Sequence, residues 1–181
     1  MGRRYDPERR QRIIDAAIRV VARDGVAGLS HRRVAAEADV PLGSTSYHFA
    51  SRDDLLVAAL GQVSDEWLAT VERWVEAVDP DLPLGEEVVR FVTDSLSGDR
   101  TRARLEYELY LAALHHPGLR PIAAGCLDAL TELLRRRTGD AARARALTVL
   151  LDGLMLQLLL TDRPVVPAEV RALVDGLAAP V

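Results

Sequence analysis

Small polar side chains are concentrated in one short stretch, LGSTSYH, at residues 42–48. The hydroxyls of Ser, Thr and Tyr and the imidazole of His donate and accept hydrogen bonds, as contact with base edges and phosphates requires. Gly43 leaves room for its backbone to approach a phosphate. A short projecting helix with these residues has the size and chemistry to enter a major groove of DNA.

Two adjacent histidines offer a different chemistry. His115 and His116 follow closely on Glu106 and Glu108, and imidazoles and carboxylates together could bind a metal ion or transfer protons. The histidines, however, stand immediately before Pro117, at the point where a helix is expected to end. We therefore expect an exposed helix end here, and we predict no metal site.

Two further patterns that are found in enzymes also have structural explanations. Asp53 and Asp54 look like paired carboxylates, but in the first turn of a helix they suit the positive end of its dipole. Cys126 lies on an apolar stripe with no histidine near it in the sequence, which favours packing. There is no glycine-rich phosphate loop and no Gly-x-Ser-x-Gly motif. We expect no catalytic residue, no enzyme activity and no cofactor.

The charges are divided unevenly along the chain. The formal net charge is −4, and all 23 basic residues are Arg. Residues 1–52 carry a net +4, whereas residues 53–181 carry a net −8. A basic head joined to an acidic body is typical of proteins that bind nucleic acid through the head. The alternative is that these arginines only solvate helix faces.

Composition also excludes several classes of protein. A single cysteine excludes a disulfide framework and a cysteine-based zinc cluster. The chain has no uninterrupted apolar run of about 18 residues, so we expect no transmembrane helix and no membrane partner. No apolar signal segment follows the basic start. We therefore expect a cytoplasmic protein.

The elements that position these residues are expected to be helices only. Apolar residues recur at helical spacing almost everywhere, and no stretch alternates with period 2. The sequence therefore predicts an all-α protein of nine helices. They are expected at about residues 7–23, 30–38, 42–48, 51–79, 83–97, 100–115, 119–138, 140–161 and 167–177.

Capping residues mark the start of two of these helices. Ser30 suits the N-cap of the second helix, and Ser51 with Asp54 forms a pair like a capping box at the start of the fourth. The second and third helices are joined by a tight turn, which is the helix-turn-helix arrangement. The helix at 140–161 is apolar nearly all round and needs to be covered on every side.

Residues 9–60 resemble the N-terminal domain of the TetR family of bacterial transcriptional regulators. The resemblance rests on Gly25, the Val-Ala-x-x-Ala pattern of the second helix, Gly43, the pair His48-Phe49, and Ser-Arg-Asp-Asp-Leu at 51–55. Two positions depart from the family. Pro41 replaces the usual Ser or Thr before the third helix, and Ser46 stands where the family usually has Tyr.

The resemblance implies a helix-turn-helix DNA-binding domain at residues 1–50 and a helical ligand-binding and dimerisation domain at 51–181. It further implies binding to double-stranded DNA through the second and third helices and the start of the fourth. Arg3 and Arg4 either reach an adjacent groove or have no contact. The implied DNA-binding residues are His31, Arg32, Arg33, Leu42, Gly43, Ser44, Thr45, Tyr47, His48, Ser51 and Arg52.

In the family, the remaining helices bind a small-molecule effector and form a homodimer. The resemblance implies a repressor that an apolar or amphipathic molecule releases from a palindromic operator. Dimerisation is expected through the last two helices, although helix 140–161 could instead be the centre of a monomer. Candidate pocket residues are Trp67, Val71, Phe91, Tyr107, Tyr110, Leu111, Leu114, Cys126, Leu130, Met155 and Gln157. Each of these could also be a core residue.

A rival interpretation is a helical scaffold that binds proteins and has lost DNA binding. The arginines Arg32, Arg33 and Arg52 and the glycine Gly43 are all present, which disfavours that loss.

Overall fold

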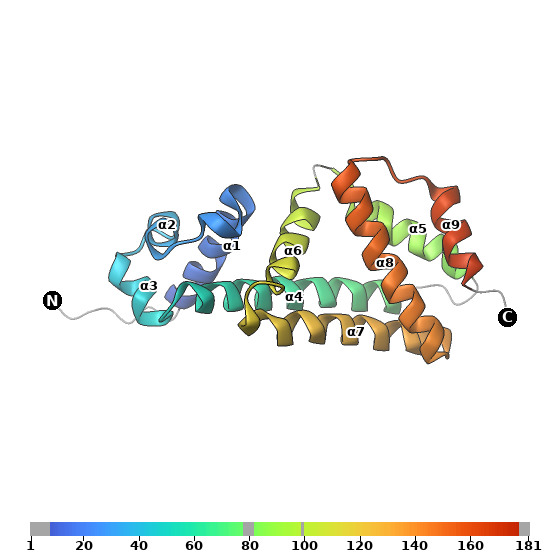
Figure 1. The fold of residues 1–181 in the computed structure, drawn as a ribbon, viewed down its shortest axis with the longest axis horizontal. Coiled ribbons are helices and arrows are strands. Elements are labelled where there is room, and N and C mark those ends of the chain that lie inside the picture. The colour runs from blue at the N-terminus through green and yellow to red at the C-terminus, as the bar shows by residue number, and fades with distance from the viewer. Residues whose placement is uncertain (1–7, 78–81, 99, 178–181) are drawn as a thin grey trace. The chain divides into compact units, whose positions relative to one another are not determined.

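The computed structural model describes residues 8–77, 82–98 and 100–177, where the secondary structure consists of helices joined by short connections (Figure 1). Within these ranges the expected all-α fold with nine α-helices is confirmed. One 3-10 turn, Pro117–Leu119, precedes α7. The helices are α1 Arg9–Gly28, α2 His31–Glu37, α3 Leu42–His48, α4 Arg52–Glu76, α5 Leu84–Ser95, α6 Thr101–Ala112, α7 Arg120–Thr138, α8 Ala141–Thr161 and α9 Pro167–Gly176.

The chain forms two compact units, and α4, α6 and α7 each contribute to both. Unit 1 consists of Met1–Val63 and Leu105–Ala123, and unit 2 consists of Ser64–Arg104 and Ala124–Val181. The domain boundary predicted after residue 50 therefore falls inside unit 1. The start of α4 and most of α6 belong with the helix-turn-helix rather than with the rest of the C-terminal part.

Unit 1 has one hydrophobic core, to which helices distant in sequence contribute. Ile13 of α1, Leu56 and Leu60 of α4 and Leu109 of α6 are at most 2% exposed. Burying each such side chain contributes about 1.5–3 kcal/mol relative to leaving it in water. Helix α2 packs on α1, and α3 packs on α2. Helices α2 and α3 are therefore attached to a core that α4 and α6 complete.

A network of charged groups joins α1 to α2 on the outside of this core. Arg19 and Arg23 contact the two oxygens of Glu37 at 2.8 and 2.9 Å, and Arg23 also contacts Asp24 at 3.1 Å. Hydrogen bonds from Arg19 and then Arg23 lower the pKa of Glu37, and a hydrogen bond from Arg23 lowers the pKa of Asp24. Several of the basic residues in the head are thus already paired within the protein.

The two predicted caps are confirmed, and they set where α2 and α4 begin. The Ser30 hydroxyl accepts from the backbone N–H of Arg33 at 3.3 Å. At the start of α4, Asp54 N–H donates to Ser51 Oγ at 3.1 Å, and Ser51 N–H donates to the Asp54 carboxylate at 2.9 Å. This reciprocal pair satisfies N–H groups that a helix start leaves without partners.

Helix α1 runs beyond its predicted end. We expected it to finish at Arg23, but helical turns continue to Gly28 after a break at Gly25. Gly25 has φ 74° and ψ 170°, a left-handed conformation that other residues rarely adopt. The glycine breaks the helix as expected, and the chain then makes one further turn before α2.

In unit 2, α5 packs beside α9, and α8 also contacts α9 (Figure 1). The hydroxyls of Thr131 and Thr148 lie 2.9 Å apart and join α7 to α8. Arg100 supports the end of α8, since its guanidinium donates to the carbonyl oxygens of Leu158 at 2.9 Å and Arg163 at 2.8 Å. These polar contacts fix how α8 ends.

Helix α8 is not covered on every side by its own chain. Only 28% of its most apolar stretch of 18 residues is buried. Val149 is 67% exposed and Leu160 is 76% exposed. By length and composition alone such a helix would suit a bilayer, but an apolar helix covered by another protein has the same properties.

Candidate nucleic-acid interface

The outer face of α2 and α3 exposes several of the predicted DNA-binding residues. Arg32 and Gly43 are exposed, Leu42 is 52% exposed and Tyr47 is 83% exposed. The half-buried ring of His48 packs edge-on against Tyr47, with ring centroids 5.2 Å apart. Leu42 and Tyr47 are large side chains that do not pack in the core, because both are exposed. This face is therefore available to a partner.

Two residues of α3 contradict the prediction that they face the groove. Thr45 has no exposed surface, and its hydroxyl donates to the carbonyl oxygen of Leu42 at 2.7 Å. Ser44 is only 6% exposed. A helix of seven residues has to bury part of its length to stay attached, and α3 buries its middle. Thr45 and Ser44 therefore support α3 from behind rather than reaching base edges.

The arginine that ends the first turn of α2 is partly engaged within the protein. Arg33 Nη1 donates to the carbonyl oxygen of Gly28 at 3.2 Å and lies 3.5 Å from the Asp24 carboxylate. Arg32 and Arg33 are both exposed, and His31 is half-buried. Arg33 thus stabilises the α1–α2 corner, and Arg32 is the better placed of the two to meet a phosphate.

The start of α4 combines predicted DNA-binding residues with contacts inside unit 1. Ser51 is the N-cap, and Arg52 Nη2 donates to the carbonyl oxygen of Val26 at 3.1 Å. Asp53 meets His116, with 3.1 Å between Oδ1 and Nδ1. His116, which we predicted to be an exposed helix end, is instead half-buried beside α4.

Both halves of the chain match models of one family. The model described as "Bacterial regulatory proteins, tetR family" matches residues 13–59, and "Tetracyclin repressor-like, C-terminal domain" matches residues 83–180. The chain belongs to the TetR family. The predicted resemblance is confirmed, and with it the helix-turn-helix head at α2 and α3. This TetR-family protein is a ligand-responsive, DNA-binding transcriptional regulator.

Relatives cover nearly the whole chain. The nicotine-responsive transcriptional repressor HdnoR of Paenarthrobacter nicotinovorans is 31% identical over 83% of this chain and 83% of its own. The regulator BetI of Burkholderia mallei is 28% identical over 86% and 84%. The multidrug-binding protein EbrR in complex with ethidium is 55% identical, with a TM-score of 0.86 over 96% and 99% of the two chains. All three are similar in length to this protein.

The predicted pocket residues differ in how far they are buried. Val71, Phe91, Leu130 and Met155 are buried, Trp67, Tyr107, Tyr110 and Cys126 are half-buried, and Leu111, Leu114 and Gln157 are exposed. Of these, the rings of Tyr107 and Tyr110 meet edge-on in unit 1, with centroids 6.1 Å apart. No group of three His, Cys, Asp or Glu side chains that could hold a metal ion occurs among the described residues.

One aromatic contact was not predicted from the sequence. Trp74 of α4 packs against Phe91 of α5, with ring centroids 4.8 Å apart. Phe91 was a predicted pocket residue, whereas Trp74 was not. No signal in the sequence joins two residues on separate helices, so only the fold could pair them.

The burial of Thr45 leads to a prediction that separates support from base reading. Thr45→Val keeps the shape of the side chain and removes its hydrogen bond to Leu42. We expect the free energy of unfolding to fall by about 1 kcal/mol, and the preferred operator sequence to stay the same. Urea unfolding and selection of binding sites from random DNA measure the two effects. If Thr45→Val changed the preferred operator sequence and left the free energy of unfolding unaltered, Thr45 would have a base-reading role after all.

Proposed function

We propose that this TetR-family regulator represses transcription from a palindromic operator and is released by a flat aromatic cation. In this proposal two copies of the chain form the active repressor in the cytoplasm, and the protein has no catalytic role. The observation that carries the DNA-binding part is the exposed face of α2 and α3, where Arg32, Gly43 and Tyr47 are open to a partner.

The residues proposed to contact DNA have distinct tasks. Tyr47 and Leu42 project from α3 and are proposed to meet the groove. Arg32 of α2 and Arg52 of α4 are proposed to meet phosphates, which position the protein without reading sequence. Arg3 and Arg4 lie outside the described residues, so their part in binding stays a prediction.

Arg32→Ala should weaken binding to every DNA sequence and make it less sensitive to salt. Loss of one phosphate contact makes the negative slope of log K against log [salt] shallower by about 1. Fluorescence anisotropy with labelled duplexes over a range of salt concentrations measures both effects. Arg90→Ala is the matched control, since Arg90 is an exposed arginine of α5 in unit 2. Equal slopes for the two variants would remove Arg32 from the interface.

A second copy of the chain is the proposed cover for α8. The residues Val149, Gly153, Leu156 and Leu160 are spaced by four, three and four positions, so they form one stripe along the helix. Apart from Gly153 itself, its two chain neighbours and the nearby helix backbone, no atom lies within 4 Å of the place where a Cβ of Gly153 would be, so a partner helix has room to approach there. Two heads about 34–36 Å apart would then meet successive major grooves.

Leu160→Glu should convert the dimer to a monomer, because it places a charge in the proposed seam. The matched control is Thr161→Glu, which adds the same charge one position along and turns it away from the stripe. Sedimentation of both variants at micromolar concentration gives the mass in solution. Wild-type protein that sediments as a monomer, or two variants with the same mass, would contradict the proposed interface.

The effector class is proposed from the relatives and from the chemistry of unit 2. EbrR, at 55% identity, has been crystallised with ethidium, proflavin and malachite green, which are all organic cations with extended aromatic rings. In this chain Trp74 and Phe91 bring two aromatic rings together, with 4.8 Å between their centroids, and aromatic rings attract cations. The net charge of −8 over residues 53–181 also favours a positively charged ligand.

Proflavin should bind this protein at least about tenfold more tightly than acridine, which has the same fused rings but is uncharged near neutral pH. Trp74→Leu should weaken proflavin binding by a similar factor, because it removes one of the paired rings. Calorimetry on the protein without DNA measures both, which avoids intercalation of the dye. Equal affinities for the two compounds would show that the ligand charge has no part in recognition.

Release from DNA requires one more comparison, because such dyes also bind DNA directly. Proflavin should displace wild-type protein from its operator at concentrations that leave Trp74→Leu bound. Displacement of both proteins at the same concentration would assign the effect to the DNA rather than to the regulator.

A further inference from the structure

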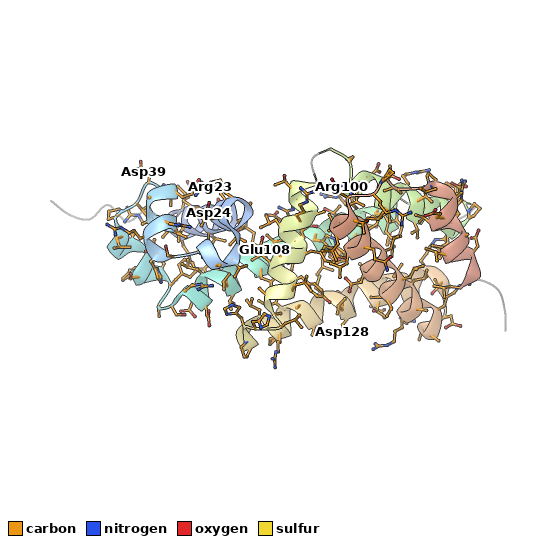
Figure 2. All side chains as sticks on the ribbon, turned by 45° about the horizontal axis from the view of Figure 1, so that its top comes forward. Arg23, Asp24, Asp39, Arg100, Glu108 and Asp128 are labelled. Carbon is orange, nitrogen blue, oxygen red and sulfur yellow. The ribbon has the colours of Figure 1, made fainter. Side chains whose placement is uncertain are left out.

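The corner between α1 and α2 is held by a residue of α6, far away in the sequence. Glu108 Oε1 accepts a hydrogen bond from the backbone N–H of Val26 at 2.6 Å, across 82 residues. Glu108 belongs to the part of α6 that lies in unit 1. Figure 2 labels its side chain on α6.

The backbone at this corner needs an outside partner. The break at Gly25 interrupts α1, and Val26 begins a new turn. The first N–H groups of a turn have no acceptor inside it and are satisfied by side chains or water. A side-chain carboxyl or amide oxygen that reaches such an N–H can accept its hydrogen bond.

Gly25 allows the carboxylate to come this close. A Cβ at position 25 would lie 2.9 Å from Glu108 Oε1, which is closer than real Cβ contacts come. Its φ of 74° is also a conformation that favours glycine. The φ by itself favours glycine here, and the missing Cβ leaves room for Glu108 Oε1 to reach the Val26 N–H.

The other end of the same residue is held as well. The carbonyl oxygen of Val26 accepts from Arg52 Nη2 at 3.1 Å, so α6 and α4 hold Val26 at both its N–H and its C=O. Two residues on, the Gly28 carbonyl accepts from Arg33 of α2 at 3.2 Å. The path from Val26 to the first turn of α2 is therefore short, and side chains hold it at Val26 and at Gly28.

We infer that Glu108 is a positioning residue for DNA binding, which holds the Gly25–Val26 corner so that α2 and α3 present their outer face in a fixed orientation. The inference rests on the proposed function, because it concerns the orientation of the DNA-reading helices. It does not require Glu108 to touch DNA. The side chain has to be long enough to reach the Val26 N–H and has to carry an oxygen that accepts its hydrogen bond. The charge of the side chain does not matter.

Three substitutions separate reach from charge. Glu108→Gln removes the charge but keeps an oxygen acceptor at the same distance along the side chain. Glu108→Asp keeps the charge but withdraws the acceptor by one methylene. Glu108→Ala removes both. Operator affinity is measured by anisotropy on a duplex selected from random DNA, at a temperature where circular dichroism shows that all variants are folded.

We expect Glu108→Gln to bind the operator as tightly as the wild type or more tightly. Glu108→Asp and Glu108→Ala should bind about tenfold more weakly. Hydrogen exchange of the Val26 amide should be faster in the Asp and Ala variants and unchanged in Gln. A purely structural role would not give this pattern of rescue by Gln. If Glu108→Ala does not fold, the Gln and Asp variants still decide the question.

The opposite pattern overturns the inference. If Glu108→Asp binds the operator like the wild type, while Glu108→Gln and Glu108→Ala both bind with a changed affinity, then only the charge of Glu108 matters. If all four proteins bind DNA equally, the contact has no consequence for reading. Wild-type protein that lacks salt-dependent DNA binding would reject the proposed function itself, and exchange of the Val26 amide would then show separately whether Glu108 holds the corner.

Discussion

The two helices of the helix-turn-helix are too short to be stable by themselves. The structure of unit 1 follows from this constraint, because its other helices have to hold these two in place. Helices α2 and α3 have seven residues each, whereas isolated helices shorter than about 12–15 residues are marginal in water. Val34 and Ala38 hold this segment in a core that includes Leu56 of α4 and Leu109 of α6. The orientation of the reading helices therefore depends on apolar contacts with α4 and α6.

Pairing within the protein decides which positive charges of the head are available. Residues 1–52 carry a net +4, but Arg19 and Arg23 are bound to Glu37, and Arg33 is directed toward Asp24. The lowered pKa of Glu37 keeps this carboxylate ionised and paired at a lower pH than a free glutamate would be. Because every basic residue is Arg, the type of residue gives no guide to the DNA face. The ion pairs that form in the fold show instead which arginines are already occupied within the protein.

Local features of the structure could be predicted from the sequence, and long-range contacts could not. Ser51 and Asp54 form the expected capping pair because both partners lie within one turn. Thr45 was assigned to the wrong face, because a short helix rich in small polar residues has no apolar stripe to show which side is buried. The contact of Glu108 with Val26 gives no periodic signal, since 82 residues separate them.

The conformation of Gly25 limits how this protein could be made more stable. Replacing glycine by alanine within helices is a common way to gain about 0.5–1 kcal/mol. At Gly25 the positive φ and the nearby carboxylate turn that gain into a loss. Gly61 of α4 and Gly125 of α7 have open space where a Cβ would lie. Engineering for heat resistance would therefore start in these long helices and leave the corner before α2 as it is.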